Sequence, residues 1–371
     1  MAVFARGVSG MAPPLARALL LWCVASTTHA RKGCQCSDLR LEEATESRVV
    51  IPRTFASRRL SAQLVLLKVP ETGSSTATRL LEELGEALER PVWSSVDRAE
   101  FDAVVKDSGR DAPKWALGHR GWGGWLHAYF HGPSVDLVTT ARLPADRLAS
   151  SAEKRLLRAE PPDCARAAGV ALKFWGIDAR RGLDAARAAS KFDTVILMER
   201  YNESLVAFAL RHRLQLADVL PPLSKYHAGA EHGEKRAQAR RACAAAVDLE
   251  ASPELKIERA IYDGAAADLD ATFAELRSAG VDVEALLKAF TGHLHAAMTT
   301  GADHKTKAMG RVDASAGLDT LIMNVCVRDC AVAALRRSVV LDYPGPEAPR
   351  PFAALALVNR SDGNLKTGRP D

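Results

Sequence analysis

The chain has 371 residues, of which 47% are hydrophobic and 26% are charged. This balance excludes a disordered polymer, a collagen-like repeat and a protein with many membrane spans. Fifty Lys and Arg residues against forty-five Asp and Glu residues give a net charge of +5, far below the basic excess of a dedicated nucleic-acid binder. The length suits two domains, or one large α/β domain with appendages.

The first 30 residues are typical of a signal peptide or a short signal anchor. Arg6 and Arg17 precede an apolar run at 18–25, and Ala30 offers a small residue for cleavage. The run is shorter than the roughly 20 apolar residues that a spanning helix needs. We therefore expect a cleaved secretory signal, with a disordered start as the alternative. Residues 31–60 are polar and Arg-rich, which predicts a stem or linker.

The cysteines agree with a secretory compartment. Cys23 lies in the predicted signal, and six of the seven cysteines follow it. An even number suits disulfides, but the sequence does not decide their pairing. Cys326 and Cys330 would share a helix face, yet no convincing ligands accompany them, so we expect no metal. Asn202 and Asn359 begin N-glycosylation sequons.

From residue 61 onward, apolar runs alternate with amphipathic segments. The run at 64–67 predicts a strand buried on both faces, and a leucine stripe at 80–88 predicts the helix after it. Further strands are predicted at 115–117, 135–140 and 194–198, and further helical segments at 145–158, from about Ser204, and at 254–291. The alternation indicates a three-layer α/β fold, a parallel sheet with flanking helices. We expect the main domain to cover 61–300 and a C-terminal extension, with a Pro-rich loop at 344–351, to cover 301–371.

A short polar loop between the first strand and its helix is the first candidate site. Its residues are Thr72, Gly73, Ser74, Ser75 and Thr76. A helix N-terminus presents unpaired amides and a positive dipole end to an anion, and Gly73 lets the backbone approach the ligand. The alternative is that one hydroxyl merely caps the helix. The pattern GxxxxGK[ST] is absent, which disfavours an ATP- or GTP-splitting enzyme and a nucleotide kinase.

The segment 66–76, LLKVPETGSST, resembles the 5′-phosphosulfate loop of Golgi carbohydrate sulfotransferases. The likeness is greatest to the galactose 3-O-sulfotransferase family, which includes galactosylceramide sulfotransferase. Residues 138–151 resemble that family's strand followed by R-D-P and a serine, and residues 194–206 resemble its apolar strand, E-Y and E-S-L helix start. With shorter likenesses at 214–220 and 260–263, the resemblance spans residues 64–276.

The resemblance implies a P-loop-like sulfotransferase fold that uses 3′-phosphoadenosine 5′-phosphosulfate (PAPS) as co-substrate. It implies that the loop at 72–76 and Lys68 contact the phosphosulfate, Lys68 as a catalytic residue. Arg142 and Ser150 match the pair that binds the 3′-phosphate, a task to which a planar guanidinium fork is suited. His119 matches the position of the base that takes the acceptor's proton, and a histidine pKa lies near neutrality.

Two positions depart from the family pattern. Leu143 stands where the family has an aspartate, and Glu71 stands where it has a lysine that contacts the phosphosulfate. A carboxylate about 4 Å from a phosphate would repel it by up to about 4 kcal/mol at an effective dielectric of about 20. Arg79 or Lys114 could supply the missing cation. A compensated enzyme, a weak enzyme and a binding protein without catalysis all remain open.

Aromatic residues follow His119 and offer faces that could stack on a sugar, with core packing as the alternative. They are Trp122, Trp125, Tyr129 and Phe130. His127 and His131 lie among them and compete with His119 for the role of base.

Together these features predict a Golgi enzyme that transfers a sulfuryl group from PAPS to a terminal galactose of a glycolipid or glycoprotein, without a metal. Its partners would be galactosyl acceptors and, through the N-terminus, a membrane, but no nucleic acid. One alternative is a uronic-acid 2-O-sulfotransferase, to which the charge of +5 lends weak support. The other is a lumenal glycan-binding protein that keeps the fold without catalysis.

Overall fold

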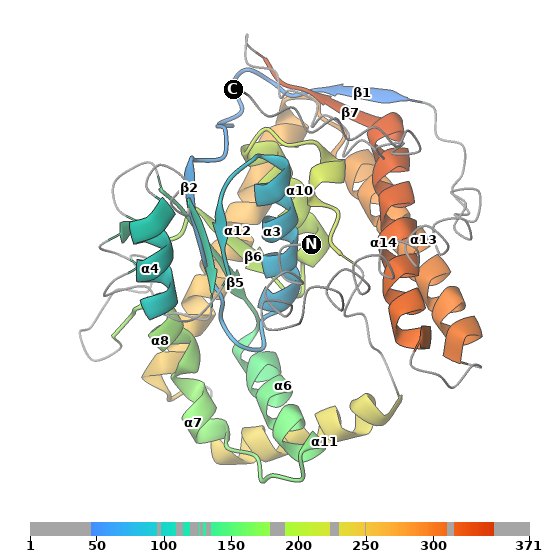
Figure 1. Cartoon of the computed structure of the whole chain (residues 1–371). Coiled ribbons are helices and arrows are strands. Elements are labelled where there is room, and N and C mark those ends of the chain that lie inside the picture. Colours follow the sequence, from blue (N-terminus) through green and yellow to red (C-terminus); the bar gives the residue numbers. More distant parts are fainter. Residues whose placement is uncertain are drawn as a thin grey trace.

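The computed structural model describes residues 46–94, 98–108, 114–118, 126, 129–130, 135–178, 190–222, 230–248, 250–309 and 315–344 (Figure 1). The predicted signal segment and Asn359 lie outside these residues, as does nearly all of the predicted loop at 344–351. No helix among the described residues combines the length and the apolar character needed to cross a bilayer.

A parallel sheet of five strands forms the centre of the molecule. In spatial order its strands are β3 (Val92–Trp93), β4 (Trp115–Gly118), β2 (Gln63–Leu67), β5 (Val135–Ala141) and β6 (Thr194–Leu197). In the central register, Leu67 lies opposite Gly118 of β4 and Thr139 of β5. The strands predicted at 64–67, 115–117, 135–140 and 194–198 are therefore confirmed.

Helices cover both faces of this sheet. In Figure 1, α3 (Ser74–Ala87) and α4 (Arg98–Ser108) lie on opposite sides of the strands. Strands covered on both faces read as continuous apolar runs, and β2 has buried leucine or valine side chains from Leu64 to Leu67. The expected α/β class, with a parallel sheet flanked by helices, is confirmed at this level.

The helices next to the central strands begin close to where the sequence places them. In α3, Leu80, Leu81 and Leu84 are buried, as the leucine stripe predicts, and Leu88 forms the C-cap. α6 (Pro144–Leu157) starts at a proline, whose fixed φ suits the first helical turn. α10 (Tyr201–Arg211) starts about one turn before the predicted Ser204.

The helical segment predicted at 254–291 consists of two helices. α12 (Pro253–Ser278) ends at a turn in which Gly280 has φ +83°, and α13 (Val283–Met309) follows it. In that turn the amide of Val281 bonds the carbonyl of Leu276 at 3.0 Å, which closes the helix end. The helical spacing of apolar residues continues across the turn at Gly280, so this spacing alone does not predict that the helix ends there.

Four further helices and one 3-10 turn are described. They are the helices α7 (Cys164–Ala168), α8 (Val170–Trp175), α11 (Ala230–Ala246) and α14 (Ser315–Ser338), with the 3-10 turn η4 (Leu216–Val219). A disulfide between Cys164 and Cys243 joins α7 to α11 and so resolves one pairing that the sequence left open.

A second, two-stranded parallel sheet pairs β1 (Ser47–Val50) with β7 (Val339–Asp342). Part of the predicted stem therefore lies beside part of the predicted C-terminal extension. Leu335, Val339 and Leu341 are buried in the same apolar core as the main sheet.

The connections of β2 and β5 diverge. β2 leads through α3 to β3 on one side of the sheet, whereas β5 leads through α6, α7 and α8 to β6 on the other. β2 and β5 are nevertheless neighbours. In open α/β sheets, ligands bind outside the carboxyl ends of the strands at such a switch point. We therefore expect a ligand site at the loops after β2 and β5.

Candidate anion-binding site at the carboxyl ends of the central strands

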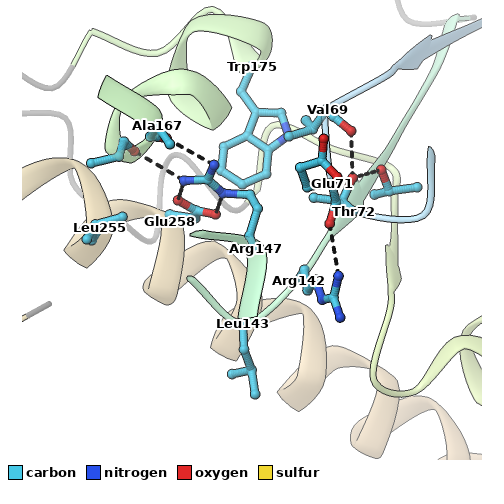
Figure 2. Close-up of polar contacts among 12 residues, drawn as sticks. Val69, Glu71, Thr72, Arg142, Leu143, Arg147, Ala167, Trp175, Leu255 and Glu258 are labelled. Carbon is cyan, nitrogen blue, oxygen red and sulfur yellow. Dashed lines mark hydrogen bonds and ion pairs between the residues drawn. The ribbon is translucent and has the colours of Figure 1, made fainter. Parts of the chain in front are cut away.

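The loop after β2 is held by its own hydroxyl groups. The hydroxyls of Thr72 and Ser74 donate to the carbonyl of Val69 at 2.9 and 2.8 Å, and both side chains are buried. The Thr72 hydroxyl also pairs with that of Thr140 at the end of β5 (Figure 2). Thr72 and Ser74 therefore shape the turn, whereas Ser75 and Thr76 lie half-buried in the first turn of α3.

A neighbouring threonine fixes β5 against β2. Thr139 donates to the carbonyl of Leu67 at 3.0 Å and accepts the indole N–H of Trp175 at 2.8 Å. All three residues are buried. A satisfied buried network of this kind keeps the ends of the two strands in one arrangement.

Gly73 is the N-cap of α3 and lies in the left-handed region, with φ +72°. No side chain caps this helix, so the alternative in which a loop hydroxyl serves only as a cap is wrong. The first amides bonded into the helix are those of Thr76 and Ala77, both to the carbonyl of Gly73. The amides of 73–75 precede these bonds and point out of the helix end, where the dipole favours an anion.

Arg142 lies directly after β5 and reaches the same loop. Its Nη1 donates to the carbonyl of Glu71 at 3.3 Å (Figure 2), and its Nε lies 3.5 Å from Glu199 Oε1. That Nε is buried and has no hydrogen-bond partner among the described residues. Burial lowers the pKa of Arg142, with a further contribution from Arg236. An N–H that makes only this long ion pair with Glu199 and no hydrogen bond among the described residues can still donate to an anionic ligand.

Ser150 lies on α6 and faces the loop from the other side. Its Oγ donates to Glu71 Oε2 at 3.4 Å, and Lys154, one turn further along, lies 2.7 Å from the same oxygen. The structure thus brings Gly73, Arg142 and Ser150 to one edge of the sheet.

The carboxylate of Glu71 is paired with Lys154, a residue that sequence reasoning missed. Of the two cations predicted to replace the family lysine at the phosphosulfate, Arg79 is exposed on α3, and Lys114 precedes β4 at the opposite edge of the sheet. The spacing of Ser150 and Lys154, four residues apart on one helix face, is the signal that could have identified Lys154.

Several predicted residues lie outside the described part of the chain. They are His119, His127, His131, Trp122 and Trp125. Lys68 is described, half-buried directly after β2 at its carboxyl end.

The two described members of the aromatic cluster pack with the core. Phe130 is fully buried, so it has no face available for a sugar. The half-buried ring of Tyr129 lies edge-on to Phe101, with 4.9 Å between the centroids. Core packing therefore explains Phe130 and accounts for this contact of Tyr129.

Two cavities, of about 450 and 280 Å³, lie away from this site. Both include Asp193, Arg211 and Asp268, and Asp193 immediately precedes β6. They thus lie near the amino ends of the strands, opposite the edge that α/β folds use for ligands. Among the described residues, no cluster of His, Cys, Asp and Glu forms a candidate metal site.

No protein-family model matches the chain, and no curated protein matches it significantly.

Proposed function

We propose that the chain is a carbohydrate sulfotransferase that transfers a sulfuryl group from PAPS to a hydroxyl of a terminal galactose. The observation that carries the proposal is the meeting of the uncapped N-terminus of α3 with Arg142 and Ser150 at the switch point of a parallel sheet. The loop amides suit the donor's 5′-phosphosulfate, and the Nε of Arg142, which makes no hydrogen bond among the described residues, suits its 3′-phosphate.

In the proposed reaction, the acceptor oxygen forms a bond to sulfur while the bond from sulfur to the 5′-phosphate oxygen breaks. The acceptor's proton passes to a base, for which His119 is the candidate, and adenosine 3′,5′-bisphosphate leaves. The amides at residues 73–75 would stabilise the negative charge that develops on the leaving phosphate. Lys68, directly after β2, is the candidate side chain for the same task.

A Golgi lumenal location belongs to this proposal. It is supported by the signal-like pattern of the first 30 residues and by the disulfide between Cys164 and Cys243. Disulfides persist in oxidising secretory compartments and are rare in the cytosol.

Transfer of radiolabelled sulfate from PAPS to galactosylceramide tests the proposal with the purified full-length chain. We expect Arg142→Gln to lower kcat/KM by about tenfold or more, because a charge-assisted contact to the donor is lost. Arg158→Gln is the matched control, since it removes the same charge from the exposed C-cap of α6. Equal rates in these two variants would contradict the assignment of Arg142.

A second candidate function, glycan binding without catalysis, is favoured by the carboxylate of Glu71 beside Ser150. The variant Glu71→Lys distinguishes the two functions in the same assay. Activity in both proteins supports an enzyme, whereas activity only in Glu71→Lys supports a natural chain without catalysis. If neither transfers sulfate to any galactosyl acceptor, the sulfotransferase proposal is wrong.

A further inference from the structure

The side chain of Glu71 lies where the loop after β2 meets α6. One of its oxygens accepts from Ser150 at 3.4 Å and lies 2.7 Å from the ammonium of Lys154. The Glu71 side chain is only 14% exposed, whereas that of Lys154 is 59% exposed. The carboxylate of Glu71 thus already binds the Ser150 hydroxyl and the Lys154 ammonium, both of which α6 presents at this edge of the sheet.

The backbone of Glu71 adopts a conformation that a glutamate rarely takes. Its φ is +66°, in the left-handed region, which is unfavourable for residues with a Cβ. Such a conformation persists when surrounding contacts impose it. Here Arg142 holds the carbonyl of Glu71, and Lys154 holds its carboxylate. The carboxylate is therefore directed toward α6 by contacts at both ends of the residue.

Two guanidinium groups at this edge of the sheet have an Nε without a hydrogen bond to any described residue: Arg142, which donates to the Glu71 carbonyl, and Arg236, whose charge acts on Arg142. Both Nε atoms are buried. The nearest described ion-pair partner of Arg236 is Asp146, at 3.8 Å. The charge of Arg142 is paired with Glu199 at 3.5 Å, but the two Nε–H groups make no hydrogen bond within the described part of the chain and can still donate to an anionic group at this edge.

We propose that Glu71 determines which nucleotides the protein prefers. Its carboxylate acts as an internal anion and takes the place, beside Ser150 and Lys154, that the ligand's second phosphate would otherwise occupy. This inference rests on the proposed function, because it takes the ligand to be an adenosine nucleotide with its 5′-phosphate at the loop. A 3′-phosphate must displace the carboxylate or bear its repulsion. In the natural chain this repulsion therefore offsets most of the attraction that Arg142 exerts on a 3′-phosphate.

Displacement of the carboxylate is feasible because the ion pair is half open to solvent. The Lys154 side chain is 59% exposed, so water solvates its ammonium when the carboxylate leaves, and this lowers the cost of breaking the pair. Once Glu71 is removed or moves aside, Lys154 becomes a donor for the incoming phosphate. Lys154 thus pairs with Glu71 in the natural protein without ligand. In a variant without the Glu71 charge it contacts the ligand.

Calorimetric titration of the full-length chain with adenosine 3′,5′-bisphosphate and with adenosine 5′-monophosphate tests this inference. For the natural chain we expect the two dissociation constants to agree within about threefold. In Glu71→Gln we expect the bisphosphate to bind about tenfold more tightly and the monophosphate to be unchanged. Glu86→Gln, an exposed position on α3, is the control for a change of net charge.

A double variant separates this role from a general effect on the loop. In Glu71→Gln with Lys154→Met, we expect the gain for the bisphosphate to disappear, because the released ammonium is no longer present. The inference is overturned if Glu71→Gln strengthens both nucleotides equally, or if the natural chain already prefers the bisphosphate by about 30-fold or more. If no protein binds either nucleotide, the proposed function fails and this inference fails with it.

Discussion

Gly73 meets two constraints that other residues would not satisfy. Its φ of +72° lies in the region that residues with a Cβ avoid. A Cβ at this position would also lie 2.4 Å from the sulfur of Met198, which follows β6. The sequence predicts a glycine at a close approach to a ligand, and the structure adds a close approach to a neighbouring side chain. The contact with Met198 could not be predicted, because it joins segments far apart in the chain.

His212 makes the stability of the protein depend on pH. Its ring is buried, lies 4.6 Å from the ring of Phe208 between centroids, and its Nε2 is 3.3 Å from Thr194 Oγ1. Burial first, and then the charge of Arg58, lowers the pKa of His212 to about 3. Because this value lies below that of an unfolded histidine, about 6.5, unfolding takes up a proton at acidic pH. The stabilisation is complete above about pH 6.5 and is lost as the pH falls toward 3.

Chemical unfolding at pH 6.5 and at pH 5 tests this effect. We expect the free energy of unfolding of the natural chain to fall by about 1.6 kcal/mol more than that of His212→Gln over this interval. His295→Gln, an exposed change on α13, should behave like the natural chain. Equal pH dependence in the natural chain and His212→Gln would mean that His212 is not held neutral by the fold.

Helices α6, α7 and α12 meet at one buried arginine. Arg147 of α6 forms a two-pronged ion pair with Glu258 of α12 (Figure 2). It also donates to the carbonyls of Ala167 at 3.0 Å and Ala168 at 3.3 Å, at the end of α7. Both charged side chains are 1% exposed. Arg147 thereby fixes the position of α6, which carries Ser150 and Lys154.

Loss of this arginine should destabilise the whole protein. We expect Arg147→Met to lower the free energy of unfolding by about 3–5 kcal/mol, because a buried carboxylate loses its partner. Replacing both partners, with Arg147→Met and Glu258→Leu together, should restore part of the loss. Arg259→Met is the control: it breaks an exposed pair with Asp263 and should cost about 1 kcal/mol or less. A cost for Arg147→Met as small as for Arg259→Met in thermal and urea unfolding would contradict this role.

Element by element, the central strands could be predicted because their apolar runs have a single consistent interpretation. The run at 64–67 and the one at 194–198 are short, apolar and bounded by polar residues, as buried parallel strands are. Boundaries set by backbone conformation were less predictable, as the break at Gly280 shows. The Arg147 contact was missed because it depends on α12, more than a hundred residues away.

At the scale of the whole molecule, the order of the strands in the sheet brings the separate sequence motifs together at the carboxyl ends of β2 and β5. Neighbouring segments in sequence do not reveal that β2 lies beside β5, nor that their connections diverge. Resemblance of short motifs led to Arg142 and Ser150, and the fold places both against the loop that contains Glu71 and Gly73. The spacing from Ser150 could have placed Lys154 on the same helix face, but its partner Glu71 lies 83 positions away in sequence and is identified only by the folded structure.

The central claim is that one donor spans the loop after β2 and Arg142. A crystal structure of the full-length chain with adenosine 3′,5′-bisphosphate tests it most directly. We predict that the 5′-phosphate accepts from the amides of residues 73–75 and that the 3′ end of the nucleotide faces Arg142, with the Glu71 side chain displaced. A nucleotide bound instead in the cavity lined by Arg58 and Arg211, at the amino ends of the strands, would contradict the account.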